Sequence, residues 1–490
     1  MSDAFDAERC LAFLEALAAD PSALAKLDRT LRKDIMTAAG RLSRPTREEH
    51  RARRRANLRE THSRVEAADE RLLQKTGIRT GRRMPAFITP KMLPSAPDLP
   101  TLGQLLEVRK CYVCKCEFRE LHHFYDQLCP PCAAFNWSKR HQTADLRGRV
   151  ALITGARVKI GYQASIMLLR AGARVIVVTR FPHDAARRYA VEPDCNDWRS
   201  RLAIHGLDLR HTPSVELFAQ HLAAHEERLD FILHNACQTV RRPVAFYAHL
   251  GTAENTSFSD LPPVQQGLLA DYEQLRRSQQ YQRVAGGLVE PARLAQVEVA
   301  PEDRLLSNRL EIFPAGMLDQ DQQQVDLRGI NSWRLKLADV STVELLEVQL
   351  VNSIAPFVLT ARLKPLMLRH PSRDKHVVNV SAMEGQFNRG NKTDKHPHTN
   401  MAKAALNMMT RTSAQDFVMD GIHMNSVDTG WVTDEDPVAL AQRKVEEHGF
   451  HPPLDIVDGA ARICDPIFAG LNTGEHQWGQ FLKDYVPVAW

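Results

Sequence analysis

The sequence contains no run of about 18 consecutive apolar residues, so it predicts no membrane-spanning helix. The opening residues, MSDAFDAERC, lack the basic-then-apolar pattern of a secretory leader, which predicts a chain that is not exported. Aromatic residues are scarce at 7%, and a net charge of +5 is too small to imply a nucleic-acid partner for the whole chain. The remaining composition, 43% hydrophobic and 25% charged over 490 residues, is typical of a cytoplasmic globular protein with two or three domains.

The positive charge is concentrated in one N-terminal segment. Residues 41–83 contain 14 Lys and Arg against 6 Asp and Glu. Within it, Thr46 and Glu49 follow Pro45 in the pattern of a capping box, which predicts the start of a long helix. Such a helix either binds a macromolecular partner, through phosphate groups or an acidic face, or is a solvated helix with interleaved Glu partners. Because few aromatics are interleaved for base stacking, the solvated helix is the preferred interpretation.

The hydrophobic pattern divides the chain into four parts. Residues 1–83 have apolar residues at helical spacing and are predicted to be helical and basic. Residues 84–102 contain five prolines and are predicted to form an extended linker. Residues 103–146 contain a cysteine cluster. Residues 147–490 alternate apolar strands with helical patterns, which predicts an α/β domain with a doubly wound parallel sheet of the Rossmann type.

An insertion of about residues 240–330 interrupts this alternation. It is polar and rich in Gln and Arg. A structureless loop of that length is improbable inside a compact domain, so we expect the insertion to contain some helix. Its position predicts that it covers or shapes a substrate pocket.

The cysteine cluster has the spacing of a metal site. Two Cys-x-x-Cys pairs lie 14 residues apart and comprise Cys111, Cys114, Cys129 and Cys132. Four thiolates in this arrangement can hold one Zn²⁺ tetrahedrally, as in a treble-clef or zinc-ribbon site. Four protein ligands indicate a closed, structural site, and two pairs at this spacing favour metal over a redox dithiol or unrelated buried cysteines. Other nearby donors compete as ligands: Cys116, His122 and His123.

A glycine-rich turn follows the strand VALIT and precedes a helix expected over residues 162–170. The turn includes Thr154, Gly155, Arg157, Lys159, Ile160 and Gly161. Between a strand and a helix, such a turn brings backbone N–H groups and the positive helix end to a pyrophosphate. The next strand, VIVVT, ends in Arg180, where enzymes that use NAD carry an acidic residue. A guanidinium there matches a 2′-phosphate, so NADP(H) is the predicted cofactor, unless Arg180 is an ordinary surface residue.

These motifs, in this order, resemble the short-chain dehydrogenase/reductase family over about residues 148–480, outside the insertion. Lys159 stands at the middle glycine of the family's motif. The resemblance implies hydride transfer between NADP(H) and a small carbonyl- or alcohol-type substrate, and assembly as a homo-oligomer. It also assigns Asp208 as the acidic residue near the adenine, and Asn235 and Ala236 as the residues after the fourth strand. Asn352 matches the proton-relay asparagine, and Thr433 lies in the turn over the nicotinamide.

The catalytic pattern departs from the family. The family places a Tyr and a Lys four residues apart on one helix, with a Ser opposite, to exchange a proton with the substrate oxygen. Lys403 matches the lysine and would also bind the cofactor, but Thr399 stands at the tyrosine. No tyrosine occurs between residues 383 and 483. In NVSA the usual serine position aligns with Ala382, so Ser381 lies one place early.

Three interpretations of this departure remain open. One is an oxidoreductase with a substitute acid from the loop before the helix, and imidazoles have the most suitable pKa. The candidate acids are Glu384, Asp394, His396 and His398. Another is hydride chemistry that needs no tyrosine, with Lys403 orienting cofactor and substrate. The third is an inactive NADP(H)-sensing adaptor that acts through its zinc and basic N-terminal regions. The retained cofactor motifs favour an oxidoreductase.

Overall fold

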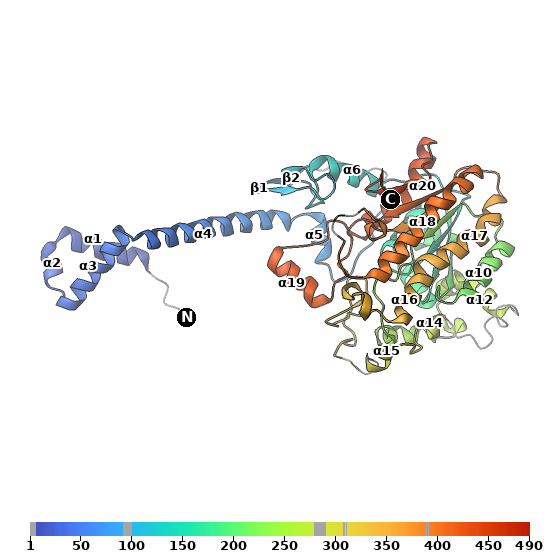
Figure 1. Ribbon diagram of the computed structural model, residues 1–490, viewed down its shortest axis with the longest axis horizontal. Coiled ribbons are helices and arrows are strands. Elements are labelled where there is room, and N and C mark those ends of the chain that lie inside the picture. Colours follow the sequence, from blue (N-terminus) through green and yellow to red (C-terminus); the bar gives the residue numbers. More distant parts are fainter. Residues whose placement is uncertain are drawn as a thin grey trace. The chain divides into compact units, whose positions relative to one another are not determined.

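The computed structural model describes residues 6–91, 100–278, 291–306, 309, 311–388, 390 and 392–490. It divides into two compact units, Met1–Arg71 and Leu72–Trp490 (Figure 1). The secondary-structure elements described in the first unit are all helices. The second unit contains the β-sheet and the cysteine cluster.

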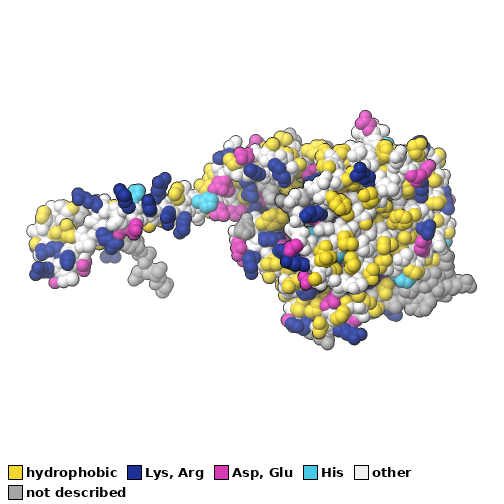
Figure 2. All heavy atoms as spheres, in the orientation of Figure 1, with side chains coloured by type: hydrophobic (Ala, Val, Ile, Leu, Met, Phe, Trp, Pro, Cys, Tyr) yellow, Lys and Arg dark blue, Asp and Glu magenta, His cyan; other side chains and the backbone are white. Residues whose placement is uncertain are grey.

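The first unit contains the predicted N-terminal helices. They are α1 (Ala7–Ala19), α2 (Pro21–Ala25), α3 (Arg29–Ser43) and most of α4 (Arg47–Leu73). The expected capping box opens α4: the Thr46 N–H donates to Glu49 at 2.9 Å, and the Glu49 N–H donates to the Thr46 hydroxyl at 3.2 Å. Helices α1, α2 and α3 bury no residue, and Lys and Arg side chains stand along α4 (Figure 2).

Residues 103–146, here called the cysteine module, lie near the start of the second unit. After α5 (Gly77–Arg82), the antiparallel strands β1 (Gly103–Lys110) and β2 (Glu117–Leu121) form a hairpin that the sequence did not predict. Helix α6 (Pro130–Arg140) starts directly after Cys129. The proline-rich linker was expected to be extended, and residues 92–99 of it lie outside the described residues. Its earlier part contacts the large domain, because the Pro90 carbonyl accepts a hydrogen bond from Arg170 at 2.7 Å.

The predicted α/β fold is confirmed by an eight-stranded sheet in the order β10-β9-β8-β7-β6-β3-β4-β5. The strands are β3 (Val150–Thr154), β4 (Arg174–Thr179), β5 (Leu202–Gly206), β6 (Phe231–His234), β7 (Lys375–Ser381), β8 (Ile422–Asp428), β9 (Phe481–Lys483) and β10 (Val486–Val488). All neighbours are parallel except β9 and β10. The strand order reverses at β3, where α/β sheets place ligands outside the carboxyl ends of the strands.

Helices cover both faces of the sheet. One face carries α7 (Lys159–Arg170) and α20 (Ile456–Thr473), whose apolar side chains share a core that includes Leu168 and Ile463. The other carries α10 (Thr212–His225), α17 (Ala355–Leu368) and α18 (Pro397–Met419). Because β3 and β4 are buried on both faces, their sequences are nearly continuous apolar runs.

One helical run in the described part of the chain, Thr342–Leu368, is long and apolar enough to cross a membrane by length and composition. It comprises α16 (Thr342–Gln349), a π-helical segment (Leu350–Ile354) and α17. Helix α17 packs against α10 and buries Leu359, Leu363 and Leu366 in the domain core. Helix α17 therefore buries one face of this run in the core of the α/β domain.

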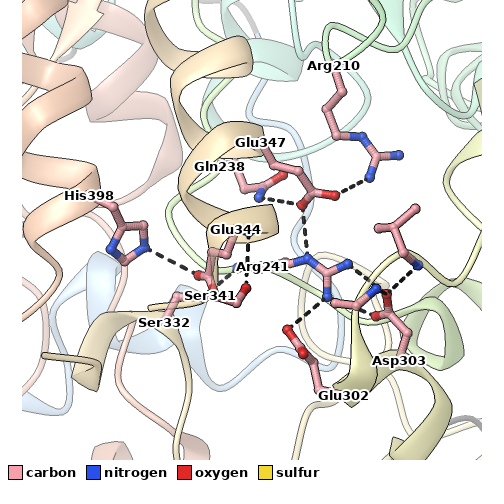
Figure 3. A network of polar contacts seen from close by, with 12 residues as sticks. Arg210, Gln238, Arg241, Glu302, Asp303, Ser332, Ser341, Glu344, Glu347 and His398 are labelled. Atoms are coloured by element: carbon pink, nitrogen blue, oxygen red, sulfur yellow. Dashed lines mark hydrogen bonds and ion pairs between the residues drawn. The ribbon is translucent and has the colours of Figure 1, made fainter. Parts of the chain in front are cut away.

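The insertion between β6 and α16 is partly helical, as predicted. Its elements include η2 (Val244–Leu250), α11 (Gly251–Glu254), η3 (Phe258–Asp260), α12 (Pro263–Arg277), α14 (Pro291–Leu294) and α15 (Pro301–Leu306). Buried ion pairs hold it to the domain: Arg241 binds Asp303 through two contacts of 2.8 Å and Glu347 of α16 at 3.0 Å (Figure 3). Glu347 also accepts from Arg210 at 2.8 Å, which links the insertion to the chain after β5.

Candidate functional site

The four cysteines of the two pairs lie together. Their sulfur atoms all lie within 4.8 Å of one another, and those of Cys114 and Cys129 are 3.5 Å apart. The Cys116 backbone N–H lowers the pKa of the Cys114 thiol to about 6, which favours the thiolate that a metal requires. The competing donors lie outside this group, and the His122 Nδ1 instead accepts the Phe124 N–H at 3.0 Å.

The glycine turn after β3 is packed against the chain that follows β6. Gly155 has φ +69°, and a Cβ there would lie 2.7 Å from the Ala236 Cα. A Cβ on Gly161 would lie 2.3 Å from the Asn235 amide nitrogen. That amide donates to the carbonyls of Thr154 at 3.1 Å and Gly155 at 3.0 Å, and the Ala236 N–H donates to the Thr154 hydroxyl at 3.0 Å. Both glycines are therefore required by close backbone approach.

Lys159 keeps the backbone conformation of the glycine that it replaces. Its φ is +59°, in the left-handed region, which costs a non-glycine residue about 1–2 kcal/mol. It is also the first residue of α7, so this helix begins three residues earlier than expected. The Lys159 ammonium lies 3.9 Å from Asp321 of the insertion. The turn thus retains its shape and gains a positive charge.

A cavity of about 500 Å³ opens at the carboxyl ends of the strands beside this turn. Most of the predicted cofactor residues line it: Gly155, Arg157, Lys159, Ile160, Gly161, Arg180, Asp208, Asn235, Ala236 and Thr433. Thr154 and Lys403 are absent from this lining. The insertion contributes Arg242, Phe246, Tyr247, Gln323 and Arg328. The volume is in the usual range for a small-molecule or cofactor site.

Arg180 is hydrogen-bonded to a neutral hydroxyl, whereas Arg157 and Asp208 of the same cavity are paired with groups of opposite charge. Its guanidinium donates to the Tyr247 hydroxyl at 2.6 Å and lies 4.8 Å from the centre of that ring. Arg157 is instead paired with Asp184 at 2.7 Å, and the Asp208 carboxylate is held by Arg210 at 2.6 Å. In the described part of the chain, no carboxylate forms an ion pair with Arg180. Its positive charge is therefore available to an anion in the cavity.

The predicted catalytic residues lie at the start of α18 and the end of β7. Lys403 is 4% exposed, and its ammonium donates to the Val380 carbonyl at 2.7 Å. Thr399 is 2% exposed, and its hydroxyl has no hydrogen-bond partner among the described residues. Ser381 donates to Asn407 at 2.6 Å, so its hydroxyl proton is already engaged.

Asn352 connects this cluster to the cavity. It lies in the π-helical segment, and such segments are frequent at functional sites. Its side-chain oxygen accepts the Gln238 N–H at 2.7 Å, and its amide donates to the Gln238 carbonyl at 3.3 Å. Gln238 and Val351 both line the cavity. Asn352 of the π-helical segment therefore fixes the backbone of Gln238 in the cavity wall.

Two family models match the chain on either side of the insertion. Residues 149–252 match "short chain dehydrogenase", and residues 328–448 match "Enoyl-(Acyl carrier protein) reductase". The chain belongs to the short-chain dehydrogenase/reductase family. An uncharacterized protein of Acanthamoeba polyphaga mimivirus is 30% identical over 393 residues, which cover 77% of this chain and 75% of that protein.

Other relatives match over a shorter length. Dehydrogenase/reductase SDR family member 13 of cattle is 33% identical over 118 residues, and mouse retinol dehydrogenase 11 is 32% identical over 110. The match to the cattle protein covers 29% of that protein and 23% of this chain. The match to the mouse protein covers 34% of that protein and 22% of this chain. Among solved structures, the RhlG/NADP complex of Pseudomonas aeruginosa has a TM-score of 0.43 at 18% identity, covering 69% of this chain and 95% of that one. The carbonyl reductase Sniffer of Drosophila melanogaster has a TM-score of 0.42 at 17% identity, covering 70% and 100%.

Among the candidate acids that could replace the family's tyrosine, His398 lies beside Thr399 and carries a carboxylate partner. It is 1% exposed, and its Nε2 lies 3.3 Å from Glu344 of α16 (Figure 3). Burial raises the pKa of Glu344, but the neighbouring His398 and Ser332 side chains outweigh it and hold the pKa below its usual value. Asp394 is exposed and pairs with Lys336 at 2.8 Å.

Residues 331–336, which follow the insertion, lie against the start of the catalytic helix. The Trp333 ring stacks on His396 at 3.9 Å, and the His396 N–H donates to the Leu335 carbonyl at 2.8 Å. Asn331 donates to the Glu435 carbonyl at 2.9 Å. We refer to residues 331–336 as the strap. No motif predicts the strap, because it depends on contacts between segments far apart in the chain.

His234 replaces the first asparagine of the family motif after β6. Its Nε2 lies 2.8 Å from the Thr360 hydroxyl of α17, and the residue is 2% exposed. Burial lowers the pKa of His234 to about 3. The imidazole is therefore neutral in the folded protein at neutral pH.

We expect the His234→Asn variant to tolerate acid better than the unchanged protein. The pKa of His234 in the folded protein lies below its value of about 6.5 in the unfolded chain. Below pH 6.5 the unfolded chain therefore binds a proton that the folded protein does not, and the free energy of unfolding falls as the pH falls. One such group costs about 1.4 kcal/mol per pH unit, or about 2 kcal/mol between pH 6.5 and 5. Denaturant unfolding at both pH values measures the difference, and an equal loss in both proteins would contradict this assignment.

Proposed function

We propose that this short-chain dehydrogenase/reductase is an NADP(H)-dependent oxidoreductase that interconverts a carbonyl and an alcohol. The observation that carries the proposal is Arg180, a guanidinium in the cavity that is bound to a neutral hydroxyl rather than to a carboxylate. A 2′-phosphate is the group that distinguishes NADP(H) from NAD(H), and a guanidinium binds it through charge-assisted hydrogen bonds.

The residues around the cavity fit the cofactor. The turn of Gly155 and Gly161 leaves no room for side chains and presents the N-terminus of α7, which suits a pyrophosphate. Arg180 would hold the 2′-phosphate, and the family resemblance assigns the ribose hydroxyls to Lys403, although Lys403 is absent from the cavity lining. Asp208, Asn235, Ala236 and Thr433 would complete the site. When bound, NADP(H) supplies or accepts the hydride.

Residues of the chain must then donate a proton to the substrate oxygen or accept one from it. A threonine hydroxyl ionises far above neutral pH, so Thr399 can orient a substrate oxygen but is a weak proton donor. His398 carries an imidazole, the side chain that most often acts as a general acid, and its Nε2 lies 3.3 Å from Glu344. We therefore assign proton donation to His398, substrate positioning to Thr399, and cofactor positioning and electrostatic stabilisation to Lys403.

The test of cofactor choice is a titration with NADPH and NADH. NADPH is expected to bind at least about ten times more tightly, because a charge-assisted hydrogen bond contributes about 1.5–3 kcal/mol. Arg180→Ala should remove most of this difference. Arg362→Ala is the matched control, because Arg362 is more than half exposed on α17, pairs with Glu216 and is absent from the cavity lining. Equal affinities in the unchanged protein would show that Arg180 does not bind the phosphate.

We also propose that the four cysteines bind one structural Zn²⁺. Their four sulfurs are close enough for one ion, and a closed set of protein ligands leaves no position for a substrate. Elemental analysis should find one zinc per chain in protein prepared without chelator. Cys129→Ser should lose the metal and unfold the module locally while the sheet remains folded. Protein that contains no zinc, or a Cys129→Ser variant that retains it, would exclude this site.

A further inference from the structure

One segment of the chain joins the cysteine module to the cofactor cavity. Residues 429–456, here called the closing segment, run from the end of β8 through α19 (Val438–His448) to the start of α20. Their inner part lines the cavity with Val432, Thr433, Asp434, Glu435, Asp436 and Val438. The backbone at the beginning of this segment is Gly430, with φ +74°.

The cysteine module holds the beginning of the closing segment. Tyr112 lies between Cys111 and Cys114, and its hydroxyl accepts the Trp431 N–H at 3.0 Å. Val432, the next residue, packs in the same apolar cluster as Cys111 and Cys129. A hydrogen bond and an apolar contact thus fix the backbone one residue before the cavity wall begins.

The module also holds the end of the closing segment. Arg140, at the end of α6, binds both carboxylate oxygens of Asp455 at 2.6 and 2.8 Å. The Tyr125 hydroxyl donates to Asp458 at 2.6 Å. The Gln127 amide donates to the His451 carbonyl at 2.7 Å. Arg140 and Asp458 are buried, so this junction excludes water and is sensitive to small displacements.

We propose that the metal-loaded cysteine module is a positioning element of the cofactor site, and that metal occupancy sets cofactor affinity. This inference rests on the proposed function. Folding of a small module of this kind is coupled to metal binding, because its apolar core is limited. Loss of the metal releases Tyr112 at one end of the closing segment and Tyr125 and Arg140 at the other. The segment then no longer holds the cavity wall in place.

The primary test compares the full-length protein as purified, after removal of zinc by a chelator, and after zinc is restored. Hydrogen exchange at residues 431–438 should increase on removal and return on reloading. The NADPH dissociation constant should rise at least about tenfold and return as well. Unchanged exchange in zinc-free protein would overturn the inference. If the zinc-loaded protein fails to bind NADPH at all, the proposed function is wrong. Hydrogen exchange at residues 431–438 then still tests whether the metal-loaded module positions the closing segment.

A conservative variant separates positioning from folding of the module. Tyr112→Phe keeps the ring and the cysteines but removes the acceptor for the Trp431 N–H. We expect unchanged zinc content, faster exchange at residue 431 and NADPH affinity weakened about fivefold, the value of one hydrogen bond. Arg119→Ala is the matched control, because Arg119 is exposed on β2 and bonds within the hairpin to the Leu106 carbonyl. Identical exchange and affinity in the two variants would contradict the role of Tyr112.

Discussion

Replacing Lys403 with methionine is expected to abolish turnover and to weaken NADPH binding about tenfold or more. Methionine keeps much of the length of the buried stem but removes the ammonium, which is 4% exposed and donates to the Val380 carbonyl. In the described part of the chain this ammonium has no carboxylate partner, and the family resemblance assigns it to the cofactor ribose although it is absent from the cavity lining. A lost charge-assisted hydrogen bond accounts for about 1.5–3 kcal/mol of binding, and a lost preorganised cation for a further factor of about 10²–10³ in kcat.

Lys364→Met is the control for this measurement. Lys364 lies on α17, and its ammonium pairs with Asp416 at 2.6 Å and Asp420 at 2.9 Å, away from the cavity lining. Removing it changes the same net charge and should leave turnover within about threefold. If Lys403→Met retains turnover within the same range, Lys403 has no role in the chemistry.

The glycine turn and the clustering of the four cysteines could be predicted because their patterns are local. Gly155 and Gly161 are set by the turn between one strand and the next helix, and the two Cys-x-x-Cys pairs by spacing within one short module. Lys159 is informative here. The sequence indicated a departure from the family motif, but the left-handed conformation was kept, so the turn tolerates the substitution.

The contacts that shape the rest of the site could not be predicted, because they join segments far apart in the chain. Tyr247 lies 67 residues after Arg180, and no pattern pairs a tyrosine in an insertion with an arginine at a strand end. Glu344 and His398 lie 54 residues apart on different helices, and Trp333 meets His396 across 63 residues. Each contact follows from how the insertion, the strap or α16 packs on the rest of the domain, which propensity and periodicity do not encode.

The identity of the proton donor is tested by two neighbouring variants. His398→Gln removes the titratable group but keeps a polar side chain beside Glu344, and we expect kcat to fall by about 10²–10⁴-fold, the range for a lost general acid. Thr399→Val removes the hydroxyl at nearly constant volume and should lower kcat by less than about tenfold. His396→Gln is the matched control, because His396 stacks on Trp333 two residues before His398 and should change kcat little.

The steady-state rate of NADPH oxidation with a panel of carbonyl and imine substrates separates the outcomes. A large loss in Thr399→Val beside a small one in His398→Gln would transfer the donor role to the threonine. A protein that binds NADPH at micromolar concentration but oxidises it with no substrate in the panel would be an NADP(H)-sensing adaptor. In that case Lys403→Met would alter cofactor binding or stability alone, since there would be no proton transfer for His398 to support. The missing tyrosine makes this experiment decisive, because any turnover must use a proton donor other than the family's own.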